Sequence, residues 1–357
     1  MKRLLQMIHG MEKRVQGGLR TYPDNYPLFQ ASKIFLLRLA EFSRRTMQQW
    51  EREGKLHSRP CPLCSHATTV LALDKRDSDG IRYSRCQQCH FVFLDPSPVE
   101  EDYNKIYETG FDGLDEWWQK KKADHGIGDD TFEYPILDTL RNYVPSGKFL
   151  DFGCGTGWVL KNVAGTYDGW GVDIDRQRLE TARRVTRLGE KIQDFRTLDR
   201  NSFLSSFEVI HSNQNLEHLL DPLAYLELFK SWLKPGGVLY FSCPASDSFA
   251  WNFLREDNSM AMLPHVSMFN EDSLRFIIRK LGFTLLELNF AFRDVSGMEF
   301  WSRILGHHIL HRHQYVRNPQ AYQILKIPMA ATEIGLTLLE KGGVLKGNYF
   351  SCLVRKV

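Results

Sequence analysis

The feature that most constrains the fold is a short apolar strand that runs directly into a loop of alternating glycines. Residues Lys148–Phe152 have the strand pattern, and Gly153, Gly155 and Gly157 follow with the spacing G-x-G-x-G. Glycine permits a positive φ and lets the backbone approach a ligand closely, and the helix after the loop offers free amides at its N-terminus. The segment therefore predicts a ligand-binding turn between a buried strand and a helix.

Acidic residues accompany this loop on two successive strands. Asp151 lies in the first strand, and Asp173 ends the next one, Trp170–Ile174, 22 residues further along the chain. In dinucleotide-binding folds a carboxylate at this point binds the hydroxyls of an adenosine ribose. The spacing G-x-G-x-G differs from the G-x-G-x-x-G that is typical of NAD binding, so the pattern favours another adenosine-containing ligand.

Strands and helices alternate from about residue 130 onward. Further strands are predicted up to Asp194 and over Phe207–Ser212, Val238–Cys243, Phe283–Phe292 and Asn348–Val354, with helices at Arg176–Arg187, Pro222–Leu233 and Asn270–Gly282. Such alternation indicates a mostly parallel sheet with helices on both faces. The predicted fold class is α/β, with a Rossmann-like sheet of seven strands.

The cysteines indicate a metal site. Four of the seven form the pattern C-x2-C-x21-C-x2-C: Cys61, Cys64, Cys86 and Cys89. Two such turns can present four thiolates tetrahedrally to zinc, and the segment between them can close as a β-hairpin. Because four sulfur ligands leave no open position, the zinc is predicted to be structural. The other three cysteines stand singly, which fits a reducing, cytoplasmic location better than a disulfide framework.

Changes in composition divide the chain into four predicted parts. A helical arm covers residues 1–57, the zinc-binding module 58–95, a helical linker 96–129, and an α/β domain 130–357 with a helical insert at 295–345. The break between module and linker is Asp95-Pro96-Ser97-Pro98, which disrupts regular structure. Within the insert, Met298–Leu310 mixes large apolar and basic residues, so it could rest on a membrane surface or cover the ligand site.

The overall charge does not indicate a nucleic-acid partner. The formal net charge is only +3, although residues 1–60 hold twelve Lys and Arg against five Asp and Glu. A basic arm of this size is typical of a solvated helix face as well as of a surface for an anionic partner. The zinc-binding segment carries only scattered basic residues, with no dense stripe beside stacking aromatics.

The glycine loop and the segments after it resemble motif I and the following motifs of class I S-adenosylmethionine-dependent methyltransferases. The matching segments are Asp151–Gly157, Val172-Asp173, Gln193-Asp194-Phe195 and Phe207–Ile210. The resemblance implies that S-adenosylmethionine is the cofactor and that the glycine loop holds its methionine portion. It also implies that Asp194 and Phe195 lie near the adenine, and Asn213 or Gln214 near the methionine end.

The resemblance extends to the order of the predicted domains. A zinc module, the segment Phe91–Pro96, a linker and a methyltransferase domain together resemble a bacterial group of zinc-containing methyltransferases. Leu263–Phe269 and Gly282-Phe283 match the late part of that domain. Members act in sugar, surface-glycan and natural-product pathways, so the resemblance implies methylation of a small molecule or glycan at oxygen or carbon.

Two histidines and one glutamate are the candidate catalytic residues. Glu217 and His218 follow strand Phe207–Ser212 at the carboxyl edge of the predicted sheet, where open α/β folds bind ligands. His218 is the first candidate for a general base, Glu217 could orient it, and His265 is the second candidate. The same pair could instead only shape the loop. Some metal-dependent methyltransferases have Glu-x-x-Glu-His here, but Gln214 replaces the first Glu, so no catalytic metal is predicted.

Two other functions fit the same motifs. An RNA methyltransferase could use an N-terminal zinc finger to bind its substrate, and salt-sensitive RNA binding would then be expected. A catalytically inactive scaffold could keep the cofactor loop without turnover. The intact Asp151, glycine loop and Asp173 favour an active enzyme over that scaffold.

Overall fold

The computed structural model describes residues 26–124, 136–258, 260–291, 335, 339 and 342–357. The start of the predicted arm and nearly all of the predicted insert, with Met298–Leu310, lie outside these residues. The described part of the arm is helix α2, Tyr26–Arg52. Among the described residues, none of the helices has the length and apolar character needed to cross a membrane.

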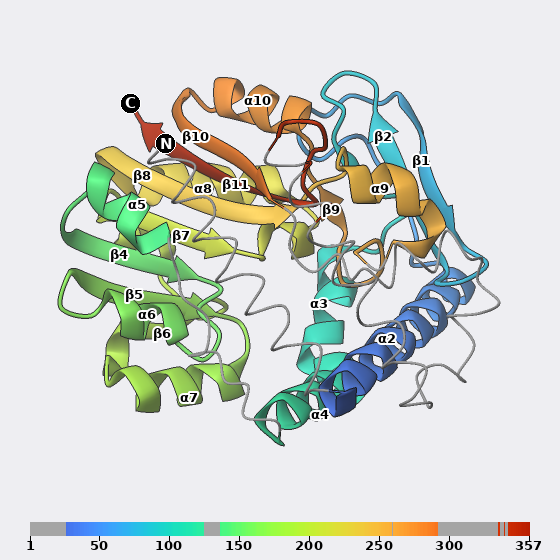
Figure 1. Cartoon of the computed structure of the whole chain (residues 1–357), viewed down its shortest axis with the longest axis horizontal. Coiled ribbons are helices and arrows are strands. Elements are labelled where there is room, and N and C mark those ends of the chain that lie inside the picture. Colours follow the sequence, from blue (N-terminus) through green and yellow to red (C-terminus); the bar gives the residue numbers. More distant parts are fainter. Residues whose placement is uncertain (1–25, 125–135, 259, 292–334, 336–338, 340–341) are drawn as a thin grey trace.

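The predicted seven-stranded sheet is confirmed. Its order is β10-β11-β8-β7-β4-β5-β6, and only the pairs that involve β11 are antiparallel. The strands are β4 Gly147–Phe152, β5 Tyr167–Asp173, β6 Ile192–Asp194, β7 Phe207–Asn213, β8 Leu233–Pro244, β10 Phe283–Ala291 and β11 Tyr349–Lys356. The parallel strands β4, β5, β6, β7 and β8 therefore end at one common edge (Figure 1).

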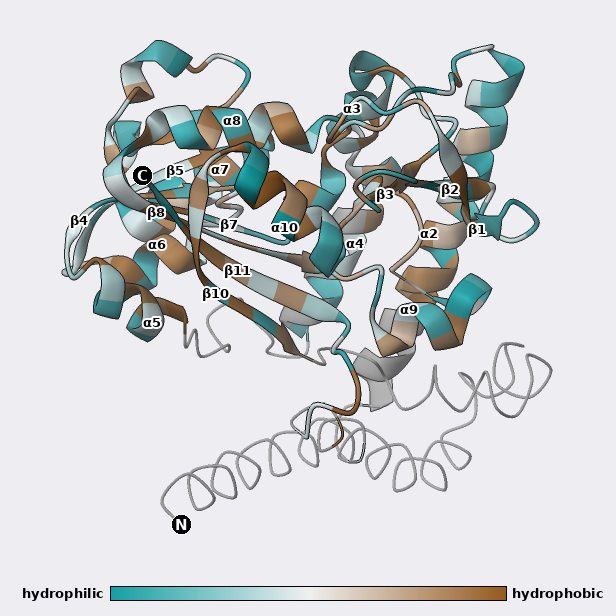
Figure 2. Ribbon diagram, turned by 90° about the horizontal axis from the view of Figure 1, so that it is seen from above, coloured by the Kyte–Doolittle hydropathy of each residue, from teal (hydrophilic) through white to brown (hydrophobic). Residues whose placement is uncertain are grey.

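Helices cover both faces of this sheet because successive side chains of a strand point to opposite faces. On one face, Phe149 and Val209 pack with helices α5 Ile136–Tyr143, α6 Trp158–Val163 and α7 Arg176–Thr186. On the other face, Leu150 and Ile210 pack with helices α8 Pro222–Trp232 and α10 Glu271–Lys280. Apolar residues accordingly line the sides of these helices that face the sheet (Figure 2).

The cysteine-bearing segment forms a second, smaller sheet. Strands β1 Thr69–Lys75 and β2 Ile81–Cys86 make the predicted hairpin, and β3 Val92–Leu94 pairs with β2. The fourth strand, β9 Ser267–Met268, comes from the late part of the chain and pairs with β3. The small sheet thus contains a strand from the segment that the sequence assigns to the α/β domain.

The predicted linker consists of helices α3 Glu100–Glu108 and α4 Gly110–Asp124, and α4 packs against α2. These helices, the hairpin, helix α9 Phe249–Leu254 and the loop before β9 share one apolar cluster. Its larger members include Phe42, Tyr83, Tyr103, Trp251 and Leu263. The linker therefore joins the small sheet to the large one instead of merely connecting them in sequence (Figure 1).

A buried ion pair fixes the hairpin to the loop that precedes β9. The ammonium of Lys75 lies 2.5 Å from a carboxylate oxygen of Asp79, and both side chains are almost fully buried. The same ammonium donates to the carbonyls of Asn258 and Ala261 at 3.0 and 2.8 Å. A buried charge needs such complete pairing, because an uncompensated one is strongly destabilising.

We expect Lys75→Met to lower the free energy of unfolding by about 3–5 kcal/mol, because it leaves the Asp79 carboxylate buried without its counterion. Urea denaturation followed by tryptophan fluorescence measures this change. The double variant Lys75→Met/Asp79→Leu should recover part of the loss. Arg76→Met is the matched control, since its ion pair with Asp74 is solvent-exposed and should be worth less than about 1 kcal/mol. Equal losses for Lys75→Met and Arg76→Met would contradict the argument.

Candidate active site and cysteine cluster

The glycine loop leaves β4 at the carboxyl edge, as predicted. Gly153, Gly155 and Gly157 have φ values of 78°, 50° and 82°, which side-chain-bearing residues rarely adopt. A Cβ on Gly153 would lie 1.9 Å from the side-chain nitrogen of Asn215, which donates to the carbonyl of Phe152. Asn215, which sequence reasoning missed, therefore clamps the loop from the segment after β7. A Cβ on Gly155 would meet no other atom within 4 Å, so the loop is open there.

Asp173, at the end of β5, holds the same loop from the other side. One carboxylate oxygen accepts from the amide of Gly155 at 2.8 Å. The other accepts from the amides of Ile174 and Asp175 at 2.8 and 3.0 Å. Burial raises the pKa of Asp173 above its ordinary value, against the effect of these amides. The structure thus brings the predicted ribose-binding carboxylate next to the open side of the glycine loop.

Asp194 and Phe195 lie at the end of β6, the neighbouring strand. Asp194 accepts from the backbone and guanidinium of Arg196 at 2.9–3.0 Å, and these bonds lower its pKa despite partial burial. The ring of Phe195 is buried among Phe152 and Tyr225. It therefore belongs to the core beneath the edge, and its contact with an adenine stays a prediction.

Asn213 and Gln214 end β7, two strands from β5. The hydroxyl of Ser242 on β8 donates to the side-chain oxygen of Asn213, and the side-chain amide of Gln214 donates to that hydroxyl at 3.2 Å. Gln214 has a φ of 52°, so the chain turns sharply there. Asn213 and Gln214 are both partly exposed at the carboxyl edge of the sheet. The resemblance implies that the methionine end of the cofactor lies there.

Asp151 occupies a different position from the other predicted cofactor residues. Its carboxylate is buried within β4 and lies 2.7 Å from Nδ1 of His211 on β7. The His211 ring stacks on Tyr240 of β8, at a centroid distance of 5.2 Å. In this structure Asp151 supports the strand beneath the loop, and a direct contact with the cofactor stays a prediction.

The three candidate catalytic residues are close together. Glu217 and His218 lie in a short 3-10 turn after β7, and His265 lies in the loop before β9. Each offers a ligand or base atom within 4.8 Å of the others, and the two imidazole centroids are 4.9 Å apart. His265 follows His218 by 47 residues in the sequence, so the fold brings this cluster together.

Burial changes the ionisation of this Glu217–His218–His265 cluster. Desolvation lowers the pKa of His218 to about 3 and that of His265 to about 4, so both imidazoles are neutral near pH 7. Desolvation also raises the pKa of Glu217 to about 8. Within the described residues, the carboxylate of Glu217 meets only its own backbone amide and the weakly polar thiol of Cys243, and neither oxygen makes a well-formed hydrogen bond.

Two tyrosines of the linker complete the walls of this cluster, and nothing in the sequence except their aromatic character indicated this position. The ring of Tyr107 meets that of His218 edge to face at 6.2 Å. Its hydroxyl lies 3.1 Å from that of Tyr103, which donates to the carbonyl of Pro264. Burial raises the pKa of Tyr107 far above its ordinary range, so its hydroxyl stays protonated.

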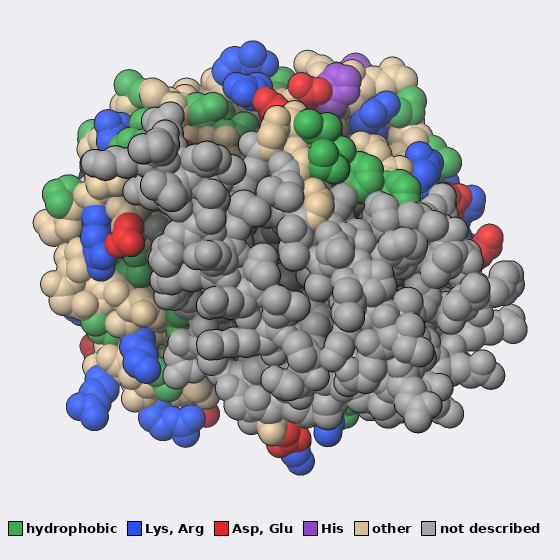
Figure 3. Space-filling model, in the orientation of Figure 1, with side chains coloured by type: hydrophobic (Ala, Val, Ile, Leu, Met, Phe, Trp, Pro, Cys, Tyr) green, Lys and Arg blue, Asp and Glu red, His purple; other side chains and the backbone are tan. Residues whose placement is uncertain are grey.

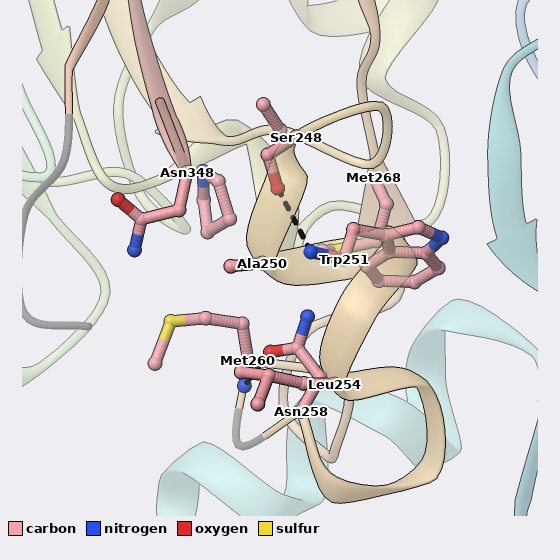
Figure 4. Close-up of a pocket in the computed structure, with 10 residues that line it drawn as sticks. Ser248, Ala250, Trp251, Leu254, Asn258, Met260, Met268 and Asn348 are labelled. Atoms are coloured by element: carbon pink, nitrogen blue, oxygen red, sulfur yellow. Dashed lines mark hydrogen bonds between the residues drawn. The ribbon is translucent and has the colours of Figure 1, made fainter. Parts of the chain in front are cut away.

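A small pocket lies next to the cluster, between α9 and the start of β11 (Figure 4). Apolar side chains of Trp251, Leu254 and Met260 line it together with the polar Asn258 and Asn348. The carbonyl of Met260 accepts from Nδ1 of His265 at 2.7 Å, which connects the pocket to the cluster. The pocket has a volume of about 10 Å³, which is room for about one water molecule.

The four predicted zinc ligands are brought together in the small sheet. All four sulfur atoms lie within 4.8 Å of one another, with Cys61 and Cys89 at 3.5 Å and Cys64 and Cys86 at 3.4 Å. For zinc–sulfur bonds of about 2.3 Å, tetrahedral sulfurs stand about 3.8 Å apart, so the donor set fits zinc. The hydrogen bond from the Cys89 thiol lowers the pKa of Cys61 to about 6, so a thiolate is available near neutral pH.

The two cysteine turns have the same backbone geometry. In the first, the amide of Ser65 donates to the carbonyl of Cys61; in the second, the amide of His90 donates to that of Cys86. Ser65 and His90 both have a φ of 61°. Each turn is also tied to the large domain, because Lys280 donates to the carbonyl of Leu63 and Asn270 to the carbonyl of His90.

Gly153→Ala should lower the free energy of unfolding by about 2 kcal/mol or more, since the new methyl group displaces Asn215 and the residue keeps an unfavourable φ. Gly155→Ala should lower the free energy of unfolding by only about 1 kcal/mol, the cost of its unfavourable φ, because its methyl group would meet no other atom. Urea unfolding of both variants measures the difference. An equal loss would show that the Asn215 clamp does not constrain the loop.

Known proteins match the α/β part of this chain. A family described as methyltransferase domain matches residues 133–288. A ubiquinone biosynthesis O-methyltransferase of Histophilus somni is 28% identical over 186 residues, which cover 48% of this chain and 74% of that protein. A malonyl-acyl-carrier protein O-methyltransferase of Halalkalibacterium halodurans is 28% identical over 170 residues, covering 44% of this chain and 59% of that protein, less than two thirds of its length.

A third relative is the O-methyltransferase cnsE of Penicillium expansum, which is 26% identical over 234 residues, covering 57% of this chain and 80% of that protein. The family match covers the glycine loop, the five parallel strands and the first part of β10, whereas β11 lies after it. The strand order, the loop at the carboxyl edge and the family match agree with one another. This chain therefore carries a methyltransferase domain with the class I, Rossmann-like fold.

Proposed function

We propose that the chain transfers a methyl group from S-adenosylmethionine to a hydroxyl oxygen of a small molecule or glycan. The observation that carries this proposal is the arrangement at the carboxyl edge of the large sheet. There the open glycine loop follows β4, the neighbour of β7, and Asp173 ends β5, one strand further along. The end of β7 leads into Glu217 and His218. A cofactor site and a candidate acceptor site thus share one edge.

The residues at the carboxyl edge of the sheet fit the ribose, the methionine end and the adenine of S-adenosylmethionine. The Asp173 carboxylate can exchange its bond to the Gly155 amide for the ribose hydroxyls, and the freed amide then faces the ligand. The amides of Asn213 and Gln214 can bind the methionine end, and Asp194 the adenine amino group. When bound, S-adenosylmethionine supplies an electrophilic methyl group on a sulfonium.

The relatives are named for O-methylation of small molecules or of an acyl carrier, which supports oxygen as the methylated atom. On the described part of the surface in Figure 3, Lys and Arg side chains are interspersed with Asp and Glu, which does not favour RNA.

In this proposal the Glu217–His218–His265 cluster activates the acceptor hydroxyl. His218 is neutral and its Nδ1 faces a carbonyl, so Nε2 carries the lone pair that can take the hydroxyl proton. The cofactor, when bound, would supply the methyl group to the acceptor oxygen with loss of its S–CH3 bond, leaving S-adenosylhomocysteine. The Tyr107 ring beside His218 helps to exclude water. The four-cysteine site would hold a structural zinc and take no part in these steps.

Asp173→Ala should weaken binding of S-adenosylhomocysteine by roughly 10–150-fold, which corresponds to the loss of charge-assisted hydrogen bonds worth about 1.5–3 kcal/mol. Isothermal titration calorimetry measures the change. Asp168→Asn, on the same strand but in an ion pair with Lys191 at the opposite end, is the control and should bind as the natural chain does. Unchanged affinity of the Asp173 variant would exclude this carboxylate from the cofactor site.

His218→Ala should lower kcat by roughly 10²–10⁴-fold and leave the affinity for S-adenosylhomocysteine nearly unchanged, because it removes the proton acceptor and not the cofactor site. The measurement is transfer of a labelled methyl group to sugar nucleotides, glycans, quinols and RNA. His57→Ala, whose side chain is exposed and outside the cluster, is the control. Methylation of RNA alone, or unchanged kcat in the His218 variant, would contradict the proposal.

A further inference from the structure

We infer that Glu217, His218 and His265 bind a divalent transition-metal ion, a second metal site besides the four cysteines. This inference rests on the proposed function, since it concerns the same acceptor site. From the sequence no metal was expected here, because Gln214 replaces a carboxylate. The structure supplies a ligand that the local sequence does not show: His265, from the loop before β9, meets Glu217 and His218 within 4.8 Å.

The hydrogen bonds of the two imidazoles prepare them as ligands. Nδ1 of His265 lies 2.7 Å from the carbonyl of Met260, and Nδ1 of His218 lies 3.4 Å from the carbonyl of Pro264. A carbonyl oxygen only accepts, so each Nδ1 must carry the hydrogen and each Nε2 is left with a free lone pair. Metal-binding histidines are oriented in this way by a carbonyl partner of their other nitrogen.

The buried carboxylate of Glu217 is a second, independent observation that favours a bound cation. The side chain is fully buried, yet among the described residues its carboxylate meets only its own backbone amide and the Cys243 thiol, and no cation or well-formed hydrogen bond balances its charge. Burying a carboxylate without a partner is costly, and buried acidic groups are normally paired or coordinate metals. A cation held between Glu217 and the two imidazoles would supply the missing counter-charge.

The composition of the site indicates the class of ion. Two imidazoles and one carboxylate suit zinc, iron(II), cobalt(II) or manganese(II), and three protein ligands leave open positions. Ligands at about 2.1 Å from such an ion stand about 3.4 Å apart, so small side-chain rotations suffice to close the set. With the ion bound, Nε2 of His218 is a ligand and no longer the base. The ion then activates the acceptor in its place, because a hydroxyl bound at an open position loses its proton to solvent more readily.

Metal analysis of the full-length chain, reconstituted with cobalt(II) and freed of excess metal, tests the inference. The natural chain should hold two ions, and the double variant His218→Ala/His265→Ala should hold one. The charge-transfer absorption from thiolate to cobalt should be equal in both, which also shows that the variant keeps its cysteine site and fold. Cys64→Ser should lose that absorption, and His57→Ala should retain both ions.

Manganese(II), which prefers oxygen and nitrogen ligands to thiolates, gives a second measurement that does not depend on the double variant. Electron paramagnetic resonance should show one bound ion in the natural chain and at least tenfold weaker binding in Glu217→Gln. One cobalt ion in the natural chain, or two in the double variant, would overturn the inference. Binding of S-adenosylhomocysteine, measured in the same samples, separates the two proposals. A chain that binds S-adenosylhomocysteine but holds one ion contradicts only the metal site. A chain that holds two ions but does not bind S-adenosylhomocysteine contradicts only the methyltransferase function.

Discussion

The rest of the structure depends on a short ladder of backbone hydrogen bonds that crosses from the small sheet to the large one. The amide of Leu94, at the end of β3, donates to the carbonyl of Val266, and the amide of Val266 donates to the carbonyl of Glu217. The hydroxyl of Tyr83 on β2 donates to the carbonyl of His265. The position of the Glu217–His218–His265 cluster is therefore set by the cysteine-bearing segment as much as by the methyltransferase sheet.

Much of the large domain could be predicted from the sequence because its signals are local. The strand and helix positions follow from the alternation of apolar residues, and the loop after β4 follows from three glycines that all have a positive φ. The helix predicted over Asn270–Gly282 is also present as α10, and the side chain of Asn270 caps it by accepting from the amide of Ser273. In each case, residues close together in the sequence carry the whole signal.

The other features of the fold and of the candidate site depend on contacts between distant segments. The spacing of residues along the chain does not reveal these contacts. The sequence places Asp151 at the end of a strand as a cofactor residue, but it does not reveal the partner His211, which lies 60 residues away and pairs with it inside the sheet. Phe195 looks like a ligand contact, but its ring fills the core next to Phe152. The approach of His265 to His218 and the insertion of β9 into the small sheet have the same origin. The roles of these residues toward cofactor, acceptor and zinc stay predictions.

Strand β9 has one more consequence, for how the chain can be divided. Its two residues, Ser267 and Met268, occupy one edge of the small sheet and are fully buried there against β3. A fragment that begins at the linker would uncover this edge and the apolar residues around it, which invites intermolecular pairing and aggregation. The cysteine-bearing segment and the late part of the α/β domain thus share one sheet and one apolar cluster, although their sequences read as separate modules.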